Sequence, residues 1–226
     1  MLQKSLLILL VCSTVLVMSF TLQKRKKVVF FGDSITQMGA EPGGYIRQME
    51  AMIAKESLGN QYELIGAGIS GNKVTDLYLR LERDVLSKQP DIVVIYVGIN
   101  DVWHKRLAGT GTDYVKYTEF YDAIVKKLQA AGAKVVVCTP SVIGERKDNS
   151  NEQDGELNMY SNWLRQYAKD KKLSCVDLRT EFQNYLIANN PANAEKGLLT
   201  TDRVHLNAAG NEFVAKTIWN TLKNVQ

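Results

Sequence analysis

Four short segments of the sequence carry groups that could take part in nucleophilic catalysis. They are residues 32–34 (GDS), 66–74 (GAGISGNKV), 97–101 (VGIND) and 201–205 (TDRVH). Together they supply a hydroxyl group, backbone N–H groups beside glycines, a side-chain amide and a histidine with a nearby carboxylate. Each segment alone has an ordinary interpretation as a turn, a weak phosphate-binding loop or a helix cap. Their combination indicates chemistry that none of them indicates singly.

A serine hydroxyl becomes an effective nucleophile when a base takes its proton. Of the two histidines, His205 has a carboxylate, Asp202, three residues before it. This carboxylate could bond one ring nitrogen, leave the other facing Ser34 and stabilise the imidazolium ion that forms. Attack on an ester also creates an oxyanion, which needs preorganised donors. The candidate donors are the N–H groups of Ser34 and Gly71 and the side-chain amide of Asn100.

Short β-rich runs alternate with longer amphipathic stretches and predict the scaffold that positions these groups. The predicted strands are residues 28–31, 62–65, 92–97, 134–138 and 174–176, and the predicted helices cover about 44–58, 73–88, 113–131, 156–171, 178–188 and 208–223. Strands such as IVVIYV are apolar on both faces, which indicates a parallel sheet covered by helices on each side. The alternation predicts a doubly wound α/β domain, whose ligands bind at the carboxyl ends of the strands.

The four segments, in this order, resemble the motif blocks of the SGNH hydrolases, the GDSL-type esterases and lipases. The resemblance covers about residues 28–226, which we expect to form one hydrolase domain. It implies a flavodoxin-like three-layer α/β/α sandwich with a five-stranded parallel sheet. It also implies the roles of the site residues, namely Ser34 as nucleophile, His205 as base, Asp202 as its orienting partner, and Gly71 and Asn100 as oxyanion donors.

The sequence departs from the family pattern in two places. Ile35 follows the serine where leucine is commoner, and Gly66 and Ala67 stand where the family often has an asparagine. In this family the residue matching Asp33 usually shapes the turn. No Gly-x-Ser-x-Gly elbow occurs in the sequence, which argues against an ordinary α/β-hydrolase.

Trp103 and His104 follow the third segment directly, so we expect them at the rim of the same cleft. They could contact substrate, or they could be an ordinary loop histidine beside a packed tryptophan, and both interpretations stay open. The long polar stretch 141–156 is predicted to be a solvated connection.

The predicted function is hydrolysis of carboxylic esters through an acyl-enzyme on Ser34. By analogy with the family we favour short acyl groups, acetyl above all, on a carbohydrate or a small alcohol. The alternatives are a lysophospholipase or thioesterase of the same fold, a non-catalytic carbohydrate-binding relic, and a nucleotide binder of the flavodoxin type. No metal or cofactor is expected, because the sequence has no Cys/His cluster with zinc spacing and no Walker motif.

Composition bounds the remaining possibilities. The chain has 226 residues, 45% of them hydrophobic, and no linker-like tract, which fits one domain. Its net charge of +4 arises in residues 1–27, which hold five basic residues and no acid; the remainder has 23 basic and 24 acidic residues. A nucleic-acid partner is therefore not expected. The oligomeric state stays open, and Cys138 and Cys175 are predicted to be buried thiols, with a bridge between neighbouring strands as the alternative.

The N-terminus predicts export. Lys4 precedes a mostly apolar run at 6–20, and a basic cluster follows at 24–27. Residues 1–23 therefore resemble a signal peptide or, alternatively, an uncleaved membrane anchor. In a bacterium the expected location is periplasmic or extracellular.

Overall fold

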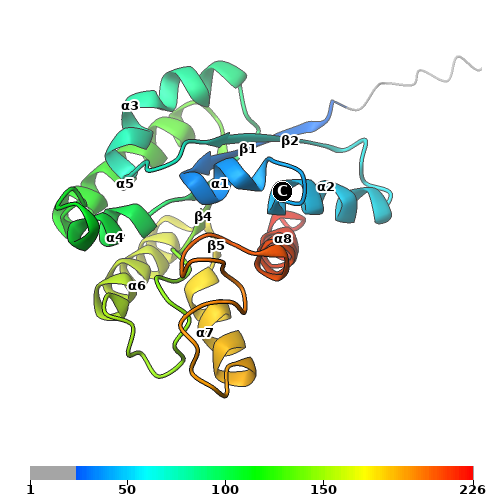
Figure 1. Cartoon of the computed structure of the whole chain (residues 1–226). Coiled ribbons are helices and arrows are strands. Elements are labelled where there is room, and N and C mark those ends of the chain that lie inside the picture. Colours follow the sequence, from blue (N-terminus) through cyan, green and yellow to red (C-terminus); the bar gives the residue numbers. More distant parts are fainter. Residues whose placement is uncertain (1–23, 226) are drawn as a thin grey trace, which may run out of the picture.

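The computed structural model describes residues 24–225 and shows a twisted sheet between two helical layers (Figure 1). All neighbouring strands are parallel, in the order β2-β1-β3-β4-β5. The strands are β1 (Lys26–Gly32), β2 (Tyr62–Gly68), β3 (Ile92–Tyr96), β4 (Lys134–Cys138) and β5 (Ser174–Val176). The predicted flavodoxin-like α/β/α sandwich with a five-stranded parallel sheet is confirmed.

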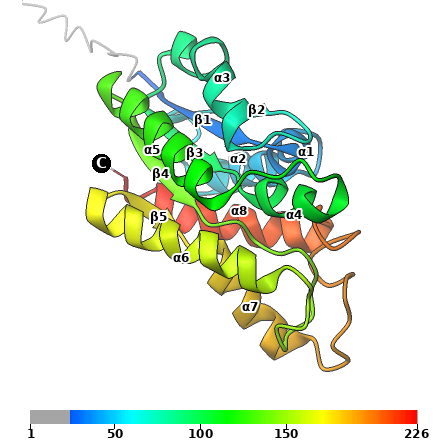
Figure 2. The same cartoon turned by 90° about the vertical axis from the view of Figure 1, so that its left-hand side faces the viewer.

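Helices cover both faces of the sheet. One face carries α3 (Val74–Asp84), α5 (Tyr114–Ala130) and α6 (Asp154–Lys171), and the other carries α2 (Tyr45–Lys55) and α8 (Ala208–Leu222) (Figure 2). A further helix, α7 (Leu178–Asn189), packs on α8 through Phe182 and Phe213, whose ring centroids are 5.3 Å apart. The central strands are apolar throughout because helices shield them from water on both sides, and all of β3 is buried.

The predicted strands and helices are all present, with ends that differ by a few residues. The predicted helix at 73–88 stops at Asp84, and a 3₁₀ helix, η1 (Leu86–Lys88), follows. Two further helices, α1 (Ser34–Gly39) and α4 (Ile99–Leu107), were not predicted. Both begin inside the functional segments, where Gly-Asp-Ser and Gly-Ile-Asn-Asp have the composition of turns.

The prediction that residues 141–156 form a solvated connection is wrong at both ends of that stretch. Residues 141–145 are buried, including the Glu145 carboxylate, and 146–150 are mostly exposed. Asn151, Gln153 and Asp154 are buried again, and α6 begins at Asp154. A polar segment can enter the interior when each of its polar groups finds a partner. The partners of Glu145 lie in the loop before His205, in the candidate active site described below.

Both cysteines of the described chain are free thiols, and no bridge joins β4 to β5; Cys138 is buried as expected, whereas Cys175 is only partly buried. Cys138 is fully buried, and burial raises the pKa of the Cys175 thiol to about 11. Both therefore behave as small apolar side chains.

The predicted signal peptide or anchor at 1–23 lies outside the described residues. Between residues 24 and 225, no helix is both long and apolar enough to span a bilayer.

Close contact between α1 and the end of β2 gives a stability prediction. A Cβ atom on Gly68 would lie 2.1 Å from Gln37 N and 2.5 Å from Thr36 C, both backbone atoms of α1. Gly68→Ala must displace this helix, and we expect it to lower the free energy of unfolding by about 1–3 kcal/mol. Urea unfolding measures the loss. Gly155→Ala, at a helical position with no atom within 4 Å of the added carbon, is the control and should be no less stable than wild type. Equal midpoints for the two variants would contradict the prediction.

Candidate active site

Ser34, His205 and Asp202 form a continuous chain of contacts at the carboxyl edge of the sheet. Ser34 Oγ lies 2.9 Å from His205 Nε2, and His205 Nδ1 lies 2.6 Å from Asp202 Oδ2. When Nδ1 carries the ring proton and donates a hydrogen bond to the carboxylate, Nε2 presents its lone pair to the serine hydroxyl. The fold thus joins a serine and a histidine that are 171 positions apart in the sequence.

Ser34 is held by the beginning of α1. The Asp33 carboxylate caps this helix by accepting the N–H of Ile35 at 3.0 Å, and the Asp33 carbonyl accepts the N–H of Gln37 at 2.9 Å. A helix of six residues has little stability of its own, so these bonds matter for its placement. They fix the serine two residues beyond the end of β1.

Asp202 orients His205 through a compact turn. Its Oδ1 accepts the N–H groups of Val204 at 3.1 Å and His205 at 2.8 Å, while Oδ2 bonds the ring. Partial burial acts to raise the pKa of Asp202, but the hydrogen bonds from His205 and the backbone outweigh it and hold that pKa below its ordinary value. The carboxylate therefore stays ionised at neutral pH and fixes the ring orientation.

Glu145 anchors the loop that carries the histidine, a role that the sequence analysis missed. Its fully buried carboxylate accepts the backbone N–H groups of Leu198 at 2.7 Å, Leu199 at 2.7 Å and Thr200 at 2.5 Å. The run SVIGE gives no sequence signal specific enough to reveal this role. Because three donors converge on one anion, the position of this loop is strongly specified.

The two other oxyanion candidates lie on neighbouring segments. Gly71 has φ +77°, a conformation that favours glycine, and no atom within 4 Å of a Cβ built on it. The Asn100 amide, only 2% exposed at the start of α4, donates to the Asn72 carbonyl at 3.0 Å. Since an amide has two N–H donors, one remains for a ligand.

Hydrogen bonds tie the Gly71 loop to the helix that begins at the serine. The N–H of Ser70 donates to Gln37 Oε1 at 2.7 Å, and the N–H of Ile69 donates to the Gly32 carbonyl at 3.3 Å. On its other side, Val74 N–H donates to the Asp101 carboxylate at 3.1 Å. The loop is therefore held between α1 and α4, beside Ser34.

Two buried carboxyl groups lie beside the site. Burial raises the pKa of Asp33 to about 7, against the opposing bond from Ile35 N–H, and the nearby Asp101 raises it further. Burial likewise raises the pKa of Asp101 to about 6. Desolvation thus outweighs hydrogen bonding at both positions, and both groups titrate near neutral pH.

Of the two predicted rim residues, Trp103 lies against His205, the middle residue of the contact chain from Ser34 to Asp202. Its ring meets the His205 ring edge-on, with centroids 6.3 Å apart and an interplanar angle of 71°. His104 packs against Trp103 on α4, with centroids 5.9 Å apart, and burial together with Lys73 lowers its pKa. Contact of either residue with substrate stays a prediction.

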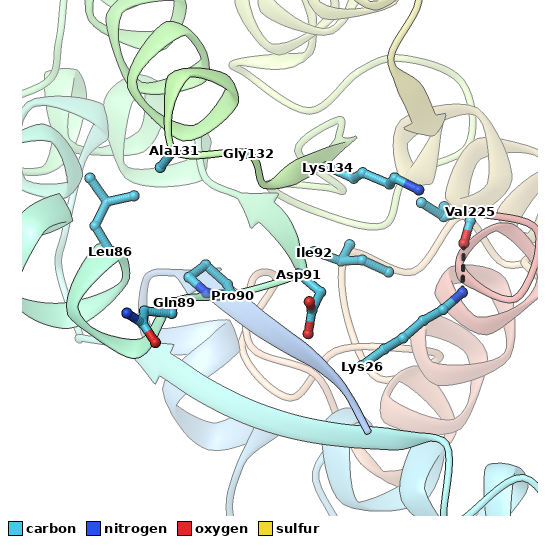
Figure 3. A pocket seen from close by; sticks show the side chains of 10 residues that line it. All are labelled: Lys26, Leu86, Gln89, Pro90, Asp91, Ile92, Ala131, Gly132, Lys134 and Val225. Carbon is cyan, nitrogen blue, oxygen red and sulfur yellow. Dashed lines mark hydrogen bonds between the residues drawn. The ribbon is translucent and has the colours of Figure 1, made fainter. Parts of the chain in front are cut away.

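A cavity of about 480 Å³ lies at the opposite edge of the sheet (Figure 3). Its walls include Lys26, Ile92 and Lys134, which are the first residues of β1, β3 and β4, whereas Ser34 lies two residues beyond the end of β1. The described residues that line it include no Ser, Cys or His. Across residues 24–225, no group of three or more His, Cys, Asp and Glu side chains could hold a metal ion.

A parallel sheet in this strand order, with a Ser–His–Asp chain at its carboxyl edge, is the architecture of an SGNH hydrolase. The chain belongs to the GDSL-like Lipase/Acylhydrolase family, which it matches over residues 30–213. The resemblance of the four segments is therefore confirmed, and the protein is a carboxylic ester hydrolase.

Several known proteins are similar to this chain over most of its length. An acetylxylan esterase of Geobacillus stearothermophilus is 30% identical over 209 residues, covering 84% of this chain and 91% of that protein. The GDSL esterase/lipase CPRD49 of Arabidopsis thaliana is 25% identical, covering 89% and 80%. The crystal structure of the acetyl xylan esterase AlAXEase has a TM-score of 0.84 at 56% identity, covering 86% of this chain and 98% of that chain.

The buried Asp33 predicts a pH-dependent stability. In the folded protein this carboxyl keeps its proton up to about pH 7, whereas its ordinary pKa is 3.8. The contribution of the protonated Asp33 to the free energy of unfolding is therefore fully present below about pH 4 and is lost as the pH rises towards about 7. Asp33→Asn keeps the cap but removes the titration, so its stability relative to wild type should be greater at about pH 8 than at about pH 5. Urea unfolding at both pH values measures this. Asp101 titrates in both proteins, so the difference between them reports Asp33 together with its coupling to Asp101. A pH-independent difference would contradict the assignment.

The Glu145 anchor predicts a loss of loop stability. Glu145→Gln places an amide among three N–H donors, and we expect a loss of about 1–3 kcal/mol in unfolding free energy. Hydrogen exchange should quicken at Leu199 and Thr200. Glu195→Gln changes a 41% exposed side chain near the same loop and serves as control, since exposed ion pairs contribute little. Wild-type exchange rates in Glu145→Gln would refute the anchoring role.

Proposed function

We propose that the protein is a serine esterase that removes short acyl groups, acetyl above all, from carbohydrates or small alcohols. The observation that carries this proposal is the contact chain from Ser34 Oγ to His205 Nε2 at 2.9 Å and from His205 Nδ1 to Asp202 at 2.6 Å. A hydroxyl, a base and an orienting carboxylate in this order are what acyl transfer by serine requires.

In the first step, Ser34 Oγ attacks the ester carbonyl carbon and its proton passes to His205 Nε2. The negative charge that develops on the carbonyl oxygen is stabilised by the N–H groups of Ser34 and Gly71 and by the Asn100 amide. The tetrahedral intermediate then expels the alcohol, which takes the proton from His205. The acyl group is left as an ester on Ser34.

In the second step, water repeats the sequence on the acyl-enzyme. His205 takes a proton from water, the hydroxide attacks the acyl carbon, and the same donors stabilise the oxyanion. Ser34 leaves with the proton from His205, and the free acid departs. Asp202, ionised at neutral pH, stabilises the imidazolium ion in both steps. The reaction balances without a metal or an organic cofactor.

Acetylated glycans are the preferred substrate class in this proposal. Two of the similar proteins bear the name acetylxylan esterase, and one of them shares 56% of its residues with this chain. The Trp103 ring beside His205 offers an aromatic wall against which a sugar could pack. The alternatives are a lysophospholipase or thioesterase acting on longer acyl groups, and a carbohydrate-binding protein without activity.

We also propose that residues 28–226 form the hydrolase domain and that residues 1–23 direct export, as a signal peptide or an anchor. The support is Lys4 followed by the apolar run at 6–20. Export would bring the enzyme to polymeric substrates outside the cell. N-terminal sequencing of the mature protein from its native host distinguishes a cleaved signal from an anchor.

The decisive experiment compares wild type with Ser34→Ala on acetylated xylooligosaccharides and on p-nitrophenyl acetate, butyrate and octanoate. We expect wild type to prefer acetyl esters and Ser34→Ala to lose about 10⁴-fold or more in kcat. Ser87→Ala, at the amino edge of the sheet, should keep wild-type activity. Mass spectrometry of the quenched reaction should find the acyl group on Ser34. Preference for octanoate would favour the lipase or thioesterase alternatives, and equal rates for folded wild type and Ser34→Ala would reject catalysis by this serine.

A further inference from the structure

One buried arginine connects the ends of two strands with the Gly71 loop. Arg80, on α3, is 6% exposed and lies with its guanidinium carbon 4.5 Å from the centre of the Phe31 ring. Its NH2 donates to the Gly32 carbonyl at 2.7 Å and its NH1 to the Ala67 carbonyl at 3.0 Å. Its Nε donates to Asn72 Oδ1 at 2.6 Å. The planar guanidinium thus holds three separate pieces of chain in one geometry.

Two of these three acceptors belong to residues next to the proposed catalytic groups. Gly32 is two residues before Ser34, at the end of β1. Asn72 follows Gly71, and its backbone carbonyl accepts the Asn100 amide at 3.0 Å. A path of direct bonds therefore runs from Arg80 through Asn72 to Asn100.

We propose that Arg80 is a positioning residue for the oxyanion hole, holding Asn72 so that the Gly71 N–H and the Asn100 amide point to the same place. This inference rests on the proposed function, because those two groups are donors only if Ser34 forms a tetrahedral intermediate. Arg80 itself lies behind the loop and touches no reacting atom.

The surroundings of Gly71 explain why its loop needs such support. No neighbouring atom lies within 4 Å of a Cβ atom built on Gly71, so side-chain packing does not hold the loop in place at this residue. Oxyanion donors accelerate a reaction only when they are held before the charge appears. The bond from Arg80 to the Asn72 side chain restrains the residue directly after Gly71.

Position 80 requires the geometry of an arginine side chain, which lysine lacks. Three acceptors in three directions need a planar group with several fixed donors, whereas an ammonium group acts as a compact point charge. The Asp84 carboxylate, 3.1 Å from NH1 on the same helix, balances the buried charge. Arg80→Lys therefore keeps the charge but should lose the geometry.

A double-mutant cycle tests the proposal with the full-length protein and p-nitrophenyl acetate as the probe. We expect Arg80→Lys and Asn72→Ala each to lower kcat by about 10- to 100-fold with KM little changed, because a small misplacement of catalytic groups costs rate rather than binding. The double variant should lose no more than either single variant, since both act through the same bond. Arg165→Lys is the control: this guanidinium also makes four hydrogen bonds, at Asp177, Thr180 and Asn162, and should keep wild-type kcat.

Several outcomes would overturn the inference. A folded Arg80→Lys with wild-type kcat would do so, as would fully additive losses in the double variant. If Arg80→Lys fails to fold, Asn72→Ala decides alone, because it leaves the contacts of Arg80 with Gly32 and Ala67 in place; a wild-type kcat in that variant rejects the proposal. A Ser34→Ala variant as active as wild type would reject the proposed function itself, and the positioning role with it.

Discussion

The structure depends on how buried backbone groups are satisfied where the parallel strands end. Beyond its last residue a strand loses the ladder that pairs its N–H and C=O groups, and an unpaired buried group is costly. Here charged side chains pair with buried backbone groups that have no ladder partner. Arg80 has this role at the ends of β1 and β2, where it donates to the carbonyls of Gly32 and Ala67, and the Glu145 carboxylate accepts three N–H groups at 198–200, in the loop before α8. These bonds also fix both sides of the candidate site, the Gly71 loop through Arg80 and the loop before His205 through Glu145.

The sign of each buried charge follows from the backbone group that it meets. Asp33 and Asp101 accept N–H groups at the beginnings of α1 and α3, where free donors and the helix dipole favour an anion. Burial nevertheless raises the pKa of both carboxyls, to about 7 and about 6. The electrostatic field at the candidate site therefore changes near neutral pH, as these two carboxyl groups lose their protons. An ionised Asp33 would attract the imidazolium that proton transfer creates on His205.

Much of the fold could be predicted because its signals are local. Strands apolar on both faces and amphipathic helices reveal the sandwich, and the order of four motifs indicates which residues could meet. Glu145 and Arg80 could not be found in this way, because their partners are distant in sequence. Gly32 is 48 positions from Arg80, and Leu198 is 53 positions from Glu145. A lone glutamate in SVIGE or an arginine in an amphipathic helix is ordinary in sequence. Only the fold shows that each side chain satisfies backbone groups of a distant segment.

Gly32 and Gly68 allow helix α1, which carries Ser34, to pack closely against the ends of the strands. A Cβ atom on Gly32 would lie 2.3 Å from Thr36 Oγ1 and 2.4 Å from the Tyr96 carbonyl, and one on Gly68 would strike the backbone of α1. The first turn of α1 can therefore lie directly over the strand ends only because these residues lack side chains. Had α1 been pushed outward, Ser34 would have moved away from His205, which is fixed independently by Glu145 and Asp202. The two glycines thus allow the close approach of Ser34 and His205, the proposed nucleophile and base, although neither glycine has a group that reacts.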